Sequence, residues 1–119
     1  MITLATLKDA SQQSVFDQIA THMMTQYTKS MAANHIECMF QTKNHLICVA
    51  RCLISDDEYT NEMNGFTWDE LISIDLVPIA HWELIEDMQS IHDLYYVVDW
   101  PGEMRKIAKD LGLRDSVIG

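Results

Sequence analysis

The sequence predicts an α+β fold in which four or five helices pack around one β-hairpin, all within a single domain formed by residues 1–119. The length of 119 residues fits one hydrophobic core. The apolar fraction of 48%, with only four Gly and two Pro residues, is typical of a globular chain. Apolar residues recur at three- and four-residue steps in several segments and alternate in one, and this combination indicates helices with a hairpin.

The first helix is predicted over residues 11–28, where one apolar stripe repeats at helical spacing. Asp9 or Ser11 is expected to cap its start by accepting a bond from a free backbone N–H. The stripe consists of Val15, Phe16, Ile19, Ala20, Met23 and Tyr27. Residues 29–35 lose this period and are expected to connect the helix to the next element.

The hairpin is predicted over residues 36–50, with its turn at Thr42-Lys43-Asn44. Folding the chain about Lys43 makes one face of both strands apolar, which fixes their register. The expected cross-strand pairs are Ile36 with Ala50, Cys38 with Cys48, and Phe40 with Leu46. Because two strands alone are marginally stable, this face is expected to pack on helices.

Capping signals predict the elements that follow. Ser55 is expected to cap a short helical turn, and Thr67-Trp68-Asp69-Glu70 is a capping box at the start of another helix. A further helix is predicted over residues 80–96. Its stripe is Leu84, Met88, Ile91 and Tyr95.

The last helix is predicted to begin after Asp99, which resembles a cap with Pro101 at an early helical position. Gly112 is expected to end it, since glycine readily adopts the left-handed conformation of a helix terminus. Its apolar residues are Met104, Ile107, Ala108 and Leu111.

The net charge is −10, and it is distributed unevenly. From Cys52 to Met104 there are thirteen carboxylates and no Lys or Arg, whereas all eight basic residues lie outside that stretch. Direct nucleic-acid binding needs basic side chains that displace counterions, so this distribution argues against it. It suits a basic protein partner, or a solvated face that only keeps the protein dispersed.

The sequence lacks a membrane span, a secretory signal and the glycine-rich loops that hold phosphates or dinucleotides. The three cysteines are an odd number, and without a signal peptide a reducing cytoplasm is the expected setting. Structural disulfides, a cofactor and a membrane contact are therefore not expected.

A partner-binding surface is predicted in the acidic stretch, where carboxylates accompany aromatic side chains that anchor interfaces. The residues assigned to it are Asp56, Asp57, Glu58, Tyr59, Glu62, Trp68 and Asp69. The acids lack the alternate ligand spacing and the glycine of a calcium loop, and helix capping with solvation is their alternative role. Of Trp68, Trp82 and Trp100, at least two are expected in the core.

A metal site is the next candidate, because His35 and Cys38 have the same spacing as His45 and Cys48, and Cys52 follows. Histidine and thiolate are zinc ligands. On a strand, however, residues three apart point to opposite faces, so each histidine is directed away from its own cysteine. The structural interpretation, in which the cysteines are small core residues, is therefore preferred and no metal is predicted.

An alternative polar site consists of Arg51, Gln89, His92 and Asp93. His92 has the titration range of a general base and would be oriented by Asp93 or Glu86, while Arg51 would suit a phosphate. A histidine with a purely structural or surface role is the simpler explanation, and no nucleophile motif surrounds Ser90, so no catalytic residue is predicted.

Five segments resemble a family of small bacteriophage and proteobacterial prophage proteins whose activity is not established. They are Val15-Phe16-Asp17-Gln18-Ile19-Ala20-Thr21-His22, Cys38-Met39-Phe40, Cys48-Val49-Ala50-Arg51-Cys52-Leu53-Ile54-Ser55-Asp56-Asp57-Glu58-Tyr59, Glu62-Met63-Asn64-Gly65 and Gln89-Ser90-Ile91-His92-Asp93. The resemblance covers most of residues 14–111. The chain departs from the family pattern in its turn at residues 41–44, in Ser55 where the family has proline, and in Asn64 where it has glutamate.

The resemblance implies phage origin and a role in the cytoplasm of an infected bacterium. Together with the small size and the acidic stretch, it leads to the hypothesis of a non-enzymatic protein that inhibits a host factor. The expected partner is a basic, nucleic-acid-binding effector of a bacterial immune system, whose positively charged groove an acidic surface could occupy. A protein that sequesters a nucleotide signal and a small hydrolase built on His92 are the alternatives.

Overall fold

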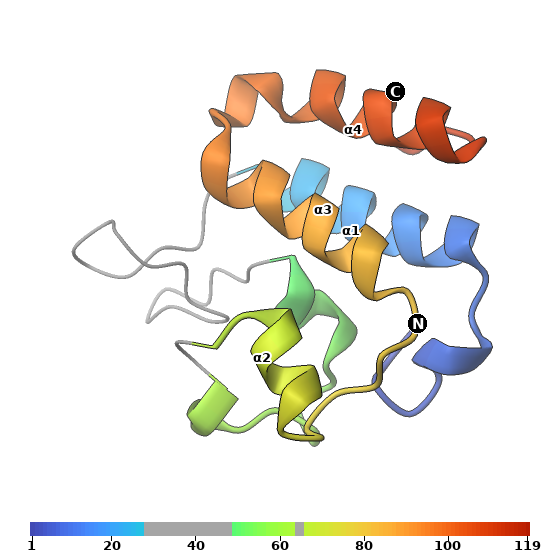
Figure 1. The fold of residues 1–119 in the computed structure, drawn as a ribbon. Helices are drawn as coiled ribbons and strands as arrows, with labels where there is room; N and C mark the ends of the chain where they lie inside the picture. Colours follow the sequence, from blue (N-terminus) through green and yellow to red (C-terminus); the bar gives the residue numbers. More distant parts are fainter. Residues whose placement is uncertain (28–48, 64–65) are drawn as a thin grey trace.

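The computed structural model describes residues 1–27, 49–63 and 66–119 (Figure 1). Within these ranges the regular structure is entirely helical, with four α-helices and four short 3-10 helices. The helical part of the predicted fold is confirmed. The predicted hairpin lies outside the described residues except for its last two positions, Val49 and Ala50. Ala50 begins the 3-10 helix η2 (Ala50–Leu53) instead of ending a strand.

Helix α1 (Gln12–Gln26) has the predicted cap and the predicted core face. The Ser11 hydroxyl accepts a 3.1 Å hydrogen bond from the Ser14 N–H, which satisfies one free donor of the first turn. Tyr27 has left-handed backbone angles and ends the helix. Five residues of the predicted stripe are buried: Val15, Phe16, Ile19, Ala20 and Met23.

Helices α2 (Trp68–Ser73) and α3 (Trp82–Leu94) pack against each other. The capping box of α2 is present, because Thr67 Oγ1 accepts from the Glu70 N–H and Glu70 Oε1 accepts from the Thr67 N–H, each at 3.1 Å. Helix α3 is shorter than the predicted range of 80–96. His81 is left-handed at one end and Tyr95 is extended at the other, so the helical period stops inside that range.

Helix α4 (Trp100–Leu111) has Pro101 in its first turn, as predicted, but the predicted Asp99 cap is wrong. Asp99 ends the 3-10 helix η4 (Val97–Asp99) with helical backbone angles. A capping side chain requires an extended backbone to reach the first N–H groups, so the Asp99 carboxylate makes no capping bond. Gly112, left-handed at φ 68°, ends the helix as expected.

Helices α1 and α3 form the centre of the molecule, and α3 contacts α1, α2, α4 and η2. Figure 1 shows α4 at one end of the molecule and α2 at the opposite end. Trp100, the first residue of α4, is fully buried and contacts the rings of Tyr27, edge-on at 6.2 Å, and His92, stacked at 5.3 Å. Among the described residues, no helix has the length and apolar character needed to cross a membrane.

Candidate functional site

All seven predicted partner-binding residues lie in a region that we call the acidic end, residues 55–63 and 66–83. This region lies on the far side of the molecule from α4 (Figure 1). It contains eight Asp and Glu residues and no Lys or Arg. The structure separates these carboxylates into some that hold the fold together and some that are exposed to solvent.

Glu58 belongs to the first group, because it fixes the N-terminal segment to the turn at residues 55–59. Its Oε1 accepts 3.0 Å hydrogen bonds from the N–H groups of Leu4 and Ser55, and its Oε2 accepts one of 3.1 Å from Ala5. Partial burial alone would raise the pKa of Glu58, but the backbone donors of Ser55, Leu4 and Ala5 prevail, so its pKa lies below the usual value. Glu58 therefore has a structural role, and its assignment to a partner surface stays a prediction.

Asp56 and Tyr59 both contact the buried side chain of Arg51, although the Asp56 side chain is itself 99% exposed. Arg51 is 4% exposed, its Nη2 donates a 2.9 Å hydrogen bond to Asp56 Oδ1, and its Nη1 donates to the Ile54 carbonyl. The guanidinium carbon lies 4.3 Å from the centroid of the Tyr59 ring, in a cation–π contact. Sequence reasoning assigned Arg51 to the alternative polar site, whereas the structure directs its guanidinium into the turn at residues 54–59.

The other assigned residues differ in exposure. Asp57, Glu62 and Asp69 are exposed, as a partner surface requires. Trp68 is buried, with 2% of its surface accessible, so its indole belongs to the core together with that of Trp100. Trp82 is the exposed tryptophan, which confirms the expectation that at least two of the three lie in the core.

Sequence reasoning missed a set of exposed apolar side chains at the acidic end, one just before α2 and the others along the connection from α2 to the start of α3. The α2 helix closes at Ile74, and the left-handed backbone of Asp75 reverses the chain before α3 begins at Trp82. Phe66, Ile74, Leu76, Ile79 and Trp82 are each 40% exposed or more. One signal in the sequence could have identified them, because these residues fall outside the helical repeats that predict buried positions.

Carboxylates also crowd one another between α2 and α3. The pKa of Glu86 lies above its usual value because of burial first, then the negative charges of Asp69 and Asp87, with the Asp69 backbone N–H acting in the opposite direction. A cation placed beside these groups would relieve their repulsion. The surface therefore combines exposed apolar side chains with carboxylates that a positive charge would stabilise.

The structure brings together Gln89, His92 and Asp93 on α3. A 2.7 Å hydrogen bond joins His92 Nδ1 to Asp93 Oδ1, and Gln89 Nε2 donates to the same oxygen at 2.8 Å. Gln89 Oε1 also accepts from the Ala50 N–H at 3.1 Å, which ties η2 to α3. His92 is 1% exposed and stacks on Trp100, and this environment is that of a core histidine held in place by its neighbours.

The candidate metal ligands His35, Cys38, His45 and Cys48 lie outside the described residues. Cys52, within them, has a thiol whose pKa is raised to about 12 by burial, with Arg51 opposing the shift. In the described ranges, no group of three or more His, Cys, Asp or Glu side chains is arranged to hold a metal ion.

Comparison with known proteins yields no relative: no family model, no curated protein and no solved structure matches the chain. A function can therefore be proposed only from the residues and contacts of this chain.

Proposed function

We propose that this protein is a phage-encoded, non-enzymatic binding protein that inhibits a host factor through its acidic end. The expected target is a basic, nucleic-acid-handling protein of the bacterial defence against phages. The observation that carries the proposal is the set of exposed apolar side chains in the acidic end, whose own residues include eight acids and no Lys or Arg, while Arg51 beside them is buried. The phage origin is supported by the resemblance of the Cys48–Tyr59 segment described above.

The two components of this surface would contribute differently to binding. The carboxylates accelerate encounter with a basic partner and select against acidic ones. Trp82 and Ile79 supply apolar area that such a contact can bury, and aromatic anchors account for much of the binding energy of interfaces. Electrostatics then determines which partner docks, and the apolar side chains hold it.

The acidic residues that we assign to the partner contact do not include those with a structural role. Asp56 and Glu58 stabilise the turn at residues 54–59, so their replacement would alter the fold together with the surface. Glu62 and Glu83 are exposed, and Glu83 lies in the first turn of α3 beside Trp82. Substitutions at Glu62 and Glu83 can therefore test binding without changing the fold.

The test is capture from bacterial lysate on immobilised protein at low and at high salt, with mass spectrometry of the bound proteins. We expect a basic nucleic-acid-handling protein at low salt, reduced at high salt and lost with the Glu62→Lys/Glu83→Lys variant. The Asp99→Lys/Asp110→Lys variant is the matched control, because it changes the net charge equally at exposed sites beside and within α4, away from the acidic end. Equal capture by both variants would contradict the proposal.

A hydrolase centred on His92 is not favoured. The imidazole is 1% exposed and lies between its hydrogen-bond partners and the Trp100 ring. Full biological activity of a His92→Gln variant that folds normally would dispose of the hydrolase.

A further inference from the structure

At the end of the molecule opposite the acidic end, the chain folds back on itself after α4. Gly112 forms the turn, in which the Leu113 N–H donates to the Ala108 carbonyl at 2.8 Å and the Gly112 N–H donates to the Lys109 carbonyl at 3.3 Å. This pair of bonds is a Schellman motif, which needs the left-handed conformation that glycine adopts without strain. The motif directs residues 113–119 back along the molecule.

The returning segment is fixed at two points. Gln13 of α1 holds the backbone of Arg114, with Oε1 accepting from its N–H at 2.8 Å and Nε2 donating to its carbonyl at 3.0 Å. Ile118 is buried against the core. The segment therefore presents its side chains from a fixed backbone, although it contains no regular structure.

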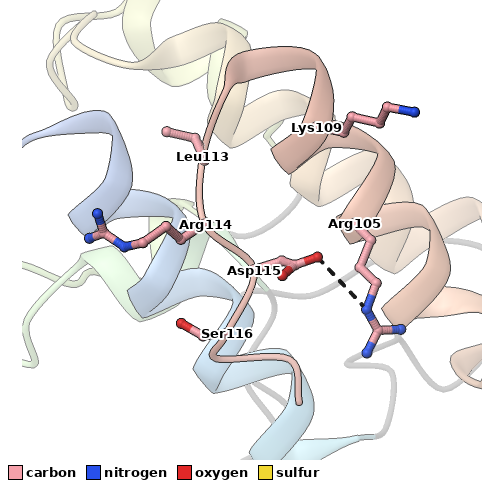
Figure 2. Close-up of a pocket in the computed structure, with 6 residues that line it drawn as sticks. All are labelled: Arg105, Lys109, Leu113, Arg114, Asp115 and Ser116. Carbon is pink, nitrogen blue, oxygen red and sulfur yellow. Dashed lines mark ion pairs between the residues drawn. The ribbon is translucent and has the colours of Figure 1, made fainter.

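The returning segment and α4 border a shallow, open depression of about 630 Å³ on the surface. It is lined by Arg105, Lys109, Leu113, Arg114, Asp115 and Ser116 (Figure 2). Three of these six residues are basic, and Asp115 is the one acid among them. We call this depression the basic cleft.

The three basic side chains of the basic cleft differ in their interactions and in their exposure. Arg105 donates from Nη2 to the Gly119 carbonyl at 2.9 Å, and its Nε lies 4.0 Å from Asp115 Oδ2. Figure 2 shows Lys109 and Arg114 extending to opposite sides of the returning segment. Both of these side chains are exposed. A ligand that contacts both side chains must therefore extend across the returning segment.

We propose that the basic cleft binds a small molecule that carries two or more adjacent phosphate groups. A single phosphate could not meet Lys109 and Arg114 together in this arrangement, whereas a phosphate chain can extend between them. Arginine and lysine are the usual phosphate-binding residues, with arginine able to form paired hydrogen bonds. The Ser116 hydroxyl supplies another donor, and the Leu113 side chain supplies an apolar wall.

The net charge of −10 does not oppose such binding at close range. Charges farther apart than about 8 Å are largely screened at physiological ionic strength. The acidic end lies across the molecule from the cleft (Figure 1), so its carboxylates contribute little to the potential there. This inference is independent of the proposed function, since it involves different residues at a different end.

Isothermal titration calorimetry with inorganic tripolyphosphate and with ATP, both free of divalent cations, tests the proposal. We expect both to bind to the wild-type protein, and equal affinities would assign recognition to the phosphate chain alone. Because a hydrogen bond to a charged group is worth about tenfold in affinity or more, Lys109→Gln/Arg114→Gln should weaken binding by at least that factor. Tighter binding of ATP would show that the nucleoside also contacts the cleft.

Lys8→Gln/Lys106→Gln is the matched control, since it removes two exposed cations that do not line the cleft. Its affinity should stay within about twofold of wild type, as expected for charges outside the site. The single variant Lys109→Gln provides a second test if the double variant folds poorly. Absence of binding at millimolar ligand, or equal weakening by the double variant and the control, would overturn the proposal.

Discussion

The acidic end and the basic cleft carry opposite charges, but they differ more in how those charges are used. At the acidic end, Glu58 and the Arg51–Asp56 pair are built into the fold, and the remaining acids surround exposed apolar side chains. At the basic cleft, the backbone is fixed by Gln13 and Gly112 while Lys109 and Arg114 are left exposed. A charged residue is therefore a candidate for recognition only when the structure does not already use it for stability.

Arg51 and Lys109 provide the strongest test of this difference, because both are cations but only one is buried. We expect Arg51→Ala to lower the free energy of unfolding by about 2–4 kcal/mol, since it leaves a cavity and removes a donor from the Ile54 carbonyl. Lys109→Ala should change it by less than about 0.5 kcal/mol, as for most exposed positions. Urea unfolding followed by circular dichroism measures both, and similar losses in the two variants would contradict the distinction.

At the acidic end, Trp82 should matter for binding more than for folding. Replacing an aromatic anchor of an interface commonly costs about 2 kcal/mol or more, so Trp82→Ala should weaken binding of the captured partner roughly 30-fold. Surface plasmon resonance with that partner measures the change. Leu94→Ala is the control, because Leu94 is another exposed apolar residue but lies beyond the acidic end. An equal effect of the two substitutions would show that Trp82 is not part of the interface.

Glu58 should behave as a structural acid with a defined pH dependence. At pH 7, Glu58→Gln should reduce the free energy of unfolding by about 1 kcal/mol, because the neutral amide keeps only one acceptor oxygen and places its NH2 group against at least one of the three backbone donors. The folded-state pKa lies below the unfolded value of 4.5, so the stabilisation is present above pH 4.5 and disappears as the pH falls through the folded-state pKa.

The difference in stability between wild type and Glu58→Gln should therefore shrink when urea unfolding is repeated at progressively lower pH. Glu62→Gln, an exposed neighbour, should show almost no difference at any pH. If the difference in free energy of unfolding between wild type and Glu58→Gln grew as the pH fell, it would contradict a lowered pKa of Glu58 in the folded state.

The smallest expected effect concerns the backbone of the basic cleft. Gln13→Leu removes both hydrogen bonds to Arg114, so the Arg114 amide should exchange its hydrogen faster while global stability falls by only about 0.5–1.5 kcal/mol. Hydrogen exchange followed by NMR resolves this amide. If its exchange rate were unchanged, Gln13 would not be what fixes the returning segment.

The predicted helices were largely correct because their signals are local. Ser11, the Thr67–Glu70 capping box and Gly112 act on backbone groups within a few residues, so their effect can be inferred from the adjacent sequence. The predicted cap at Asp99 was wrong because capping also depends on the backbone conformation of the capping residue. The preceding 3-10 helix gives it helical backbone angles, and residue type alone does not reveal this.

The candidate sites were less predictable because they depend on distant contacts. Glu58 is joined to Leu4 across 54 positions, and Gln13 to Arg114 across 101, so no local pattern marks either pair. The charge asymmetry was visible in the sequence, but it did not distinguish structural acids such as Glu58 from exposed ones such as Glu83. Burial of Trp68 and exposure of Trp82 likewise depend on how α2 packs against α3.

Hydrogen–deuterium exchange of the protein with and without its captured partner tests the central claim most directly. The account predicts slower exchange in peptides that cover residues 66–83, and no change in those that cover residues 100–119. Protection confined to residues 100–119, or no protection in either region, would contradict the assignment of the acidic end as the binding surface.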